Sequence, residues 1–124
     1  MTRVLVVDDN PVARCVAVMA LELAGMDVDE APDGSLALER LAAEPADAVV
    51  LDIMMPGLSG HDVLAERRRR HLAPETAVIM LTCKTDDADI TRAFAAGACD
   101  YMTKPFDPDA LVRAVRTAVY GSIG

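Results

Sequence analysis

Residues 4–9 read Val-Leu-Val-Val-Asp-Asp, four apolar residues that stop abruptly at two carboxylates. A short apolar run of this kind, rich in Val and bounded by polar residues, is typical of a buried strand in a parallel sheet. Three later runs have the same form and end at Asp52, Thr82 and Lys104. Chemistry in an open α/β sheet gathers at the carboxyl ends of the strands, so we expect these polar residues to meet at one edge.

The segments between these runs have the character of helices. The first is expected to span Pro11 to Leu23, with Asn10 as its N-cap and Gly25 after its end. We expect further strands at 27–31, 47–52, 77–82 and 99–103, and further helices at about 34–44, 60–70, 87–96 and 108–119.

This alternation predicts an α/β fold, a flavodoxin-like (βα)5 doubly wound sandwich with a parallel five-stranded sheet in the order 2-1-3-4-5. Right-handed crossovers place helices on both faces of such a sheet. The polar strand at 27–31 fits the edge position in this order. The cleft would then lie beside the first and third strands, where the strand order reverses.

The composition fits one soluble domain. The chain has 124 residues and is 52% hydrophobic, and domains commonly contain about 100–150 residues. We expect residues 1–124 to form a single domain with its core at about 3–120, and 121–124 to be a tail or the start of a linker. The net charge of −8 argues against binding to nucleic acid or to an anionic membrane. No signal peptide and no membrane-spanning run is evident, which indicates a cytoplasmic protein.

The three cysteines, Cys15, Cys83 and Cys99, show no spacing typical of zinc ligands. Each lies in or beside an apolar stretch, so we expect buried free thiols in a reducing compartment.

Asp8, Asp9 and Asp52 are predicted to converge at the cleft. Clustered carboxylates are costly without a cation, and hard oxygen ligands suit Mg²⁺, for which Mn²⁺ could substitute. Thr82 and Lys104 would add a hydrogen-bond donor and a positive charge, which are the groups that phosphoryl oxygens need beside a metal. A cis peptide bond at Pro105 would aim the ammonium of Lys104 inward, and the sequence leaves that bond's state open.

In their order along the chain, these motifs resemble the receiver domains of bacterial two-component response regulators, the superfamily of the chemotaxis regulators. The resemblance covers about residues 3–120. The matching pieces are Val-Val-Asp-Asp at 6–9, Leu-Asp-Ile-Met-Met-Pro-Gly at 51–57, Leu-Thr at 81–82, Gly-Ala at 97–98 and Asp-Tyr-Met-Thr-Lys-Pro-Phe at 100–106.

The resemblance implies a role for each residue of the cleft. Asp52 would be the phosphoacceptor, a carboxylate nucleophile that takes a phosphoryl group from a histidine kinase or a phosphotransfer protein. Asp9, Asp52 and the backbone carbonyl of Met54 would ligate Mg²⁺, and Asp8 would hold its waters. Lys104 would pair with a phosphoryl oxygen.

The resemblance also implies residues that switch the conformation and residues that set the rate of dephosphorylation. Thr82 would move toward the phosphoryl group, and Tyr101 would turn into the space that Thr82 leaves. Met54 and Lys84 lie two residues past the acceptor and past Thr82, and they would tune dephosphorylation. The domain would signal and would not be an enzyme, because its chemistry is limited to its own phosphorylation and slow dephosphorylation.

The output surface is expected on the fourth helix, the fifth strand and the fifth helix, with Val112 and Val119 at its apolar centre. That surface could form a phosphorylation-dependent homodimer or meet an effector of a kind that the sequence does not identify. Winged-helix transcription regulators usually have two acidic residues before the switch tyrosine, whereas this chain has Cys99 and Asp100, which weighs against that subfamily.

Two other functions remain open from the residues alone. A Mg²⁺-dependent aspartyl-phosphate phosphohydrolase would also use an Asp nucleophile, but Met54 stands where such enzymes carry a second acid. A flavin or nucleotide binder of the same fold would need a Gly-rich loop after the first strand, and residues 8–11 are Asp-Asp-Asn-Pro.

Smaller signals have simpler interpretations. Arg67 to Arg70 would be a solvated helix end that complements the helix dipole, or else a docking patch for an acidic surface. His61 and His71 lack further metal ligands and are expected at the surface. Phe94 fits the buried face of its helix.

Overall fold

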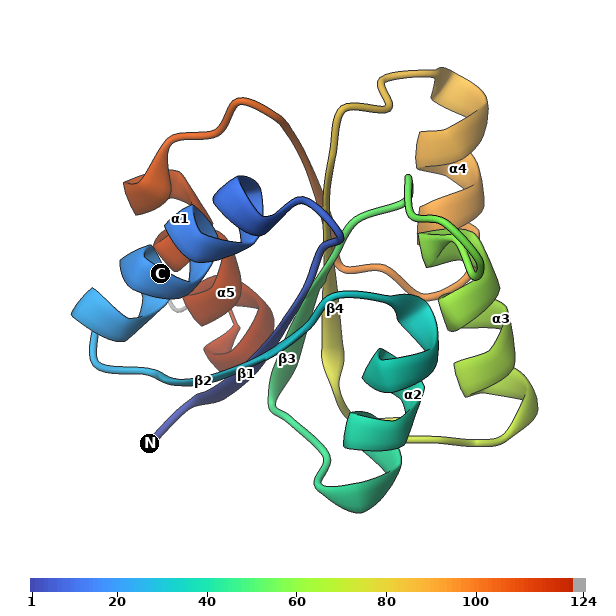
Figure 1. Ribbon diagram of the computed structural model, residues 1–124, viewed down its shortest axis with the longest axis horizontal. Coiled ribbons are helices and arrows are strands. Elements are labelled where there is room, and N and C mark those ends of the chain that lie inside the picture. Colours follow the sequence, from blue (N-terminus) through green and yellow to red (C-terminus); the bar gives the residue numbers. More distant parts are fainter. Residues whose placement is uncertain (122–124) are drawn as a thin grey trace.

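The computed structural model describes residues 1–121, and its core is one parallel sheet of five strands (Figure 1). The order β2-β1-β3-β4-β5 confirms the predicted topology. The strands are β1 (Arg3–Val7), β2 (Asp27–Ala31), β3 (Ala48–Leu51), β4 (Ala77–Thr82) and β5 (Asp100–Thr103). Every neighbouring pair is parallel, so the carboxyl ends of all five strands lie on the same side of the molecule.

The helices form a layer on each face of this sheet. Two of them pack on one face and three on the other (Figure 1). The first pair is α1 (Pro11–Leu23) and α5 (Pro108–Tyr120), and the other three are α2 (Gly34–Ala43), α3 (Gly60–Arg69) and α4 (Asp87–Ala95). The predicted bounds agree with these to within one or two residues. None of these helices is long and apolar enough to cross a membrane.

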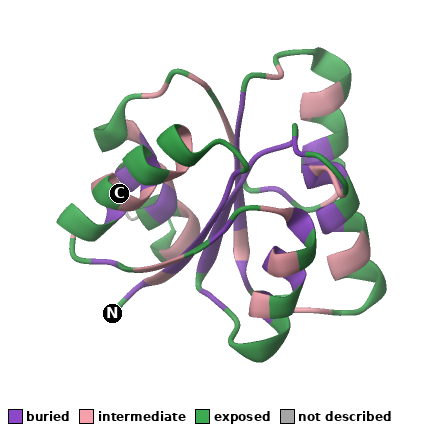
Figure 2. Cartoon of the chain, viewed as in Figure 1, coloured by how far each residue is buried: buried purple, intermediate pink, exposed green. Residues whose placement is uncertain are grey.

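Burial follows the position of each strand in the sheet (Figure 2). All four residues of β3 are buried, because this central strand is covered by helices on both faces. In β2, at the sheet edge, only Ala31 is buried. The acidic side chains of this edge strand face solvent or pair with arginines such as Arg3 and Arg14, and charge on an edge discourages pairing with another sheet.

Helix capping fixes where α1 and α3 begin. The Asn10 side chain accepts hydrogen bonds from the backbone N–H groups of Val12 and Ala13. Ser59 and Asp62 form a reciprocal capping box at α3, which satisfies two N–H groups that the helix leaves free. Both helices therefore start directly after the loops that carry the carboxylates.

Two expectations about burial, those for the cysteines and for Phe94, were wrong. All three cysteines are exposed and free. Phe94 is 45% exposed, because Ala93 occupies the buried position of α4 and the next side chain points away. Of the predicted tail at 121–124, Gly121 follows α5, and residues 122–124 lie outside the described part of the chain.

Candidate functional site

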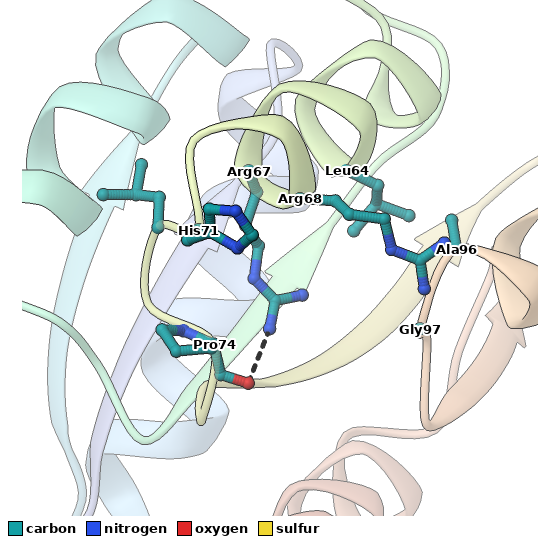
Figure 3. Close-up of a pocket in the computed structure, with 8 residues that line it drawn as sticks. Leu64, Arg67, Arg68, His71, Pro74, Ala96 and Gly97 are labelled. Carbon is teal, nitrogen blue, oxygen red and sulfur yellow. Dashed lines mark hydrogen bonds between the residues drawn. The ribbon is translucent and has the colours of Figure 1, made fainter.

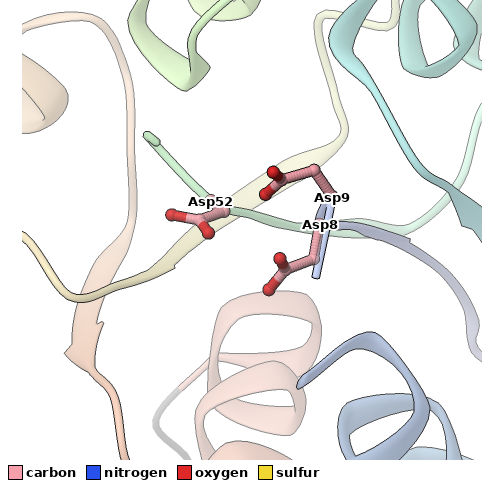
Figure 4. Close-up of side chains that lie close together, drawn as sticks. All are labelled: Asp8, Asp9 and Asp52. Carbon is pink, nitrogen blue, oxygen red and sulfur yellow. The ribbon is translucent and has the colours of Figure 1, made fainter. Parts of the chain in front are cut away.

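Three carboxylates meet where β1 and β3 end (Figure 4). One oxygen from each of Asp8, Asp9 and Asp52 lies within 4.8 Å of the others. Asp8 and Asp52 are 3% and 5% exposed, whereas Asp9 is open to solvent. The pairing of β1 with β3 brings Val7 beside Leu51, so the residues that follow each strand must be neighbours. The predicted convergence of these side chains is present.

Lys104 supplies the positive charge of the cluster. Its Nζ donates hydrogen bonds to Asp8 Oδ2 at 2.6 Å and to Asp52 Oδ2 at 2.9 Å. The Lys104-Pro105 peptide bond, whose state the sequence left open, is cis. Burial disfavours the ammonium, but the hydrogen bonds to Asp8 and Asp52 outweigh burial and raise the pKa of Lys104. Lys104 therefore stays charged and holds two of the three carboxylates.

Burial has the opposite consequence for Asp8. It raises the pKa of Asp8, and the hydrogen bonds from Lys104 and from the Asn10 backbone N–H oppose that rise only in part. In this cluster one ammonium lies beside three carboxylates and donates to two of them. Hard oxygen ligands in excess of their protein counter-charge are the donor set that Mg²⁺ accepts, so the residues present fit that ion.

The backbone around Asp52 is held closely. The Met54 N–H donates to Asp52 Oδ1 at 3.1 Å, and the Gly60 N–H donates to the Ile53 carbonyl at 2.9 Å. A Cβ at position 60 would lie 2.4 Å from the Asp52 carbonyl oxygen. Only glycine allows the start of α3 to approach the Asp52 loop this closely.

The loop after β4 is attached to both predicted switch residues. Thr82 is fully buried, and its Oγ1 accepts a hydrogen bond of 3.3 Å from the Lys84 N–H. The Tyr101 hydroxyl donates to the Lys84 carbonyl at 2.8 Å. Burial, followed by the charges of Asp89, Asp52 and Asp86, raises the pKa of Tyr101. The neutral phenol therefore connects β5 to this loop.

Comparison with known proteins identifies the family. Residues 4–116 match the family described as "Response regulator receiver domain". The chain is 40% identical over 118 residues to transcriptional regulatory protein CseB of Streptomyces coelicolor, covering 95% of the chain and 49% of that protein. It is 42% identical over 119 residues to KdpE of Mycobacterium tuberculosis, covering 96% and 51%. The chain belongs to the response regulator receiver domains.

A solved structure agrees with this receiver assignment. The chemotaxis protein CheY4 of Vibrio cholerae is 30% identical, with a TM-score of 0.89 over 95% of this chain and 98% of that one. The chain spans about half the length of the curated relatives it matches. These relatives are regulators, so the phosphohydrolase and flavin-binder alternatives are not favoured.

The prediction that Val112 and Val119 form the apolar centre of the output surface was wrong. Val112 is 9% exposed and packs in the core with Val115, and Val119 is half-buried against the same cluster. Both valines lie on the sheet side of α5, because the helix buries its apolar stripe there. A contact on this face of the receiver domain would have to use other side chains.

The arginine run agrees with the interpretation as a solvated helix end at Arg68, Arg69 and Arg70, which are exposed at the end of α3, but not at Arg67. The half-buried Arg67 guanidinium donates to the carbonyls of Ala73, Pro74 and Thr76, and it borders a pocket of about 250 Å³ between the ends of α3 and α4 (Figure 3). Because its donors already serve the loop after α3, we interpret Arg67 as structural. Arg69 and Arg70 pair with Glu66 on their own helix.

Sequence reasoning missed two features near the cleft. His61 is 5% exposed, not at the surface, and its Nε2 lies 2.9 Å from Asp89 Oδ1. On α1, large apolar side chains are exposed along one face, namely Val12, Val16, Met19 and Leu23. The sequence did contain a signal for the second feature, because Arg14 and Glu22 are the only charged residues from Pro11 to Leu23, so the helix has more apolar side chains than one buried face can hold.

Proposed function

We propose that Asp52 accepts a phosphoryl group from a phosphohistidine. A carboxylate oxygen of Asp52 forms a bond to phosphorus, the nitrogen–phosphorus bond of the donor breaks, and its electron pair returns to the donor imidazole. The observation that carries this assignment is the position of Asp52, a buried carboxylate held by Lys104 at 2.9 Å beside two further carboxylates. The ammonium of Lys104, which already contacts Asp52, would pair with an oxygen of the phosphoryl group.

The side chains of Asp9 and Asp52, with the backbone carbonyl of Met54, would hold Mg²⁺ or Mn²⁺, and Asp8 would hold its waters. When bound, the ion neutralises charge on the phosphoryl oxygens as the acceptor carboxylate approaches. Asp9 supports this assignment because its carboxylate is exposed, and because the ammonium of Lys104 donates to Asp8 and Asp52 and not to Asp9.

The donor is proposed to be a histidine kinase or a phosphotransfer protein that docks on α1. This helix begins two residues after Asp9. Its apolar stripe is exposed, with 71% of Val12, 41% of Val16, 56% of Met19 and 86% of Leu23 accessible. Spacings of four, three and four residues place these side chains on one face, which supports docking of an apolar helical surface beside the acceptor. This setting implies a cytoplasmic protein.

Phosphorylation is proposed to act through Thr82 and Tyr101 on the surface of α4, β5 and α5. Both residues bond the loop that leads into α4, which supports a short path from the cleft to that surface. A homodimer through α4, β5 and α5, or contact with an effector domain, would be the response. Since the named relatives CseB and KdpE are transcriptional regulators, we propose control of transcription as the output of the whole protein.

Self-dephosphorylation is proposed to be slow. The apolar Met54 side chain, 53% exposed at the mouth of the cleft, cannot orient a water strongly, and Lys84 could lie across the phosphoryl group. Replacing both residues with polar or acidic ones, as in Met54→Asn with Lys84→Glu, should speed the decay.

Uptake of a phosphoryl group from acetyl phosphate tests this function. With Mg²⁺, intact-mass measurement should show one acid-labile and hydroxylamine-labile phosphoryl group. Asp52→Asn should abolish uptake with the fold intact, and Asp9→Ala should abolish it through loss of the metal. Equal uptake with and without Mg²⁺, or in Asp52→Asn, would contradict the proposal.

A further inference from the structure

A groove of about 490 Å³ borders the Asp52 loop, and its lining includes two polar residues, His61 and Asp89, that the proposed chemistry does not use. Met54 and Met55, from the loop that follows Asp52, line this groove together with His61 from α3, Lys84 from the loop after β4 and Asp89 from α4. The groove therefore brings the acceptor loop together with polar side chains from three separate elements.

Asp89 binds two of these groups at once. Its Oδ1 lies 2.9 Å from His61 Nε2, and its Oδ2 lies 3.9 Å from Lys84 Nζ. The first contact is buried, because the His61 side chain is 5% exposed, while the Lys84 side chain is 39% exposed. Asp89 is thus anchored firmly on the α3 side and loosely on the Lys84 side.

The imidazole of His61 has one productive arrangement here. Its Nδ1 is buried and has no hydrogen-bond partner within residues 1–121. Because a carboxylate only accepts hydrogen bonds, the ring donates from Nε2 to Asp89, which makes it an anchor for that side chain. An orphaned buried nitrogen carries a cost, and the contact of Nε2 with Asp89 is the hydrogen bond that holds the ring in place.

The Lys84 side chain is held least tightly of the three. The backbone of Lys84 is fixed by Thr82 and Tyr101, but its ammonium makes only the long contact to Asp89 among the described residues. Phosphorylation of Asp52 would add a second anion at the same groove. The Asp89 carboxylate and the phosphoryl group would then compete for one ammonium.

We propose that His61 and Asp89 are positioning residues that set the lifetime of the phosphoryl group by controlling Lys84. This inference rests on the proposed phosphorylation of Asp52. In hydrolysis a water oxygen attacks phosphorus, the bond from phosphorus to the Asp52 oxygen breaks with its electron pair returning to the carboxylate, and the water proton leaves with phosphate or solvent. Lys84 lying over the phosphoryl group hinders that water, and Asp89 draws Lys84 away.

His61 moderates the competition. While its N–H occupies one oxygen of Asp89, that carboxylate attracts Lys84 less strongly than a free carboxylate would. The two anchors therefore act in opposite directions. Removing the charge of Asp89 releases Lys84 to the phosphoryl group, and removing the imidazole strengthens the hold of Asp89 on Lys84.

The test measures phosphoryl decay after loading with acetyl phosphate and Mg²⁺ in the intact chain. Asp89→Asn should lengthen the lifetime about threefold and His61→Leu should shorten it about threefold, the change that one partly exposed ion pair supports. His61→Gln, which can still donate to Asp89, should lie near the parent. In a Lys84→Ala background neither Asp89→Asn nor His61→Leu should change the decay.

Two variants serve as matched controls. Asp87→Asn removes an exposed carboxylate from the same turn of α4, and His71→Leu removes an exposed imidazole beyond the end of α3. Both should decay like the parent. Leucine nearly matches histidine in volume and leaves no orphaned nitrogen, so His61→Leu should fold. Asp89→Asn, made in the parent and in the Lys84→Ala variant, tests the control of Lys84 without changing His61.

Several results would overturn the inference. These are shifts of the same sign in Asp89→Asn and His61→Leu, effects that persist without Lys84, or loss of phosphoryl uptake in Asp89→Asn, which would place that residue in the acceptor chemistry. If the parent takes up a phosphoryl group normally and the phosphoryl group decays at the same rate in every variant, this inference alone is overturned. A parent that takes up none overturns the proposed function as well.

Discussion

At the scale of single residues, the acidic cluster is a compromise between stability and chemistry. Lys104 neutralises part of the charge of Asp8 and Asp52, and Asp9 is left without such a partner in that cluster. Like charges this close repel even when they are partly solvated. The free protein therefore retains an electrostatic strain at the position where a cation would bind.

Asp9→Asn should raise the free energy of unfolding of the metal-free protein by about 0.5–1 kcal/mol, the size expected for relief of one partly exposed charge contact. Mg²⁺ should raise the free energy of unfolding of the parent as its concentration rises above the dissociation constant, and should raise that of the variant much less. Urea denaturation with and without Mg²⁺ measures both effects. A destabilised Asp9→Asn in chelator would contradict the repulsion argument.

Tyr101 gives a dependence on alkaline pH. Burial raises its pKa above the ordinary value of 10.0, so the folded state keeps the phenol proton after the unfolded chain has lost it. This contribution to stability is complete below about pH 10 and is lost as pH rises through the folded pKa. In Tyr101→Phe the free energy of unfolding should fall less steeply above about pH 10. Equal slopes for the two proteins would show that the phenol is not protected.

At the scale of elements, two helices serve the site in different ways. Helix α3 packs its first residue against the backbone of Asp52 and Ile53, and α1 carries an apolar face that nothing within the described residues covers. The sequence predicted both helices from their caps and periodicity. It could not predict the close approach at Gly60, because that depends on how the loop after β3 folds back.

Gly60→Ala should disturb the acceptor loop. Its Cβ would lie 2.4 Å from the Asp52 oxygen and 2.8 Å from the Ile53 Cα, and backbone atoms cannot move aside as a flexible side chain could. We expect a loss of about 2 kcal/mol in unfolding free energy and slower phosphoryl uptake. Ser35→Ala, an exposed change near the start of α2, is the control. Parent-like stability and uptake in Gly60→Ala would refute the close approach.

Met19→Glu should separate docking from chemistry. A carboxylate in the α1 stripe should slow transfer from a phosphohistidine kinase about tenfold, as expected for the loss of one interface anchor. Uptake from acetyl phosphate should be unchanged, because Met19 lies outside the cleft. Phe94→Glu, at an exposed apolar position of α4, should slow neither reaction. A selective effect of Phe94→Glu instead would move the donor surface to α4.

At the scale of the whole molecule, periodic patterns of apolar residues in the sequence correctly predicted the strands, the helices and their arrangement, which depend mainly on the backbone. Val-rich runs, an acidic edge strand and helix caps were sufficient for the strand order, and strand order alone brought Asp8, Asp52 and Lys104 together. Predictions about single side chains at element surfaces fared worse. His61, Phe94 and the three cysteines were misplaced because their burial depends on what a neighbouring helix contributes, which one sequence does not reveal.

The residue that we expect to receive the phosphoryl group is Asp52. Borohydride reduces an aspartyl phosphate to homoserine, so reduction of the phosphorylated protein followed by peptide mass mapping reads the position directly. We expect homoserine at position 52 alone, in Mg²⁺-dependent amount, and none in Asp52→Asn. Homoserine at position 8 or 9, or a phosphoryl group on Thr82 that borohydride leaves in place, would contradict it.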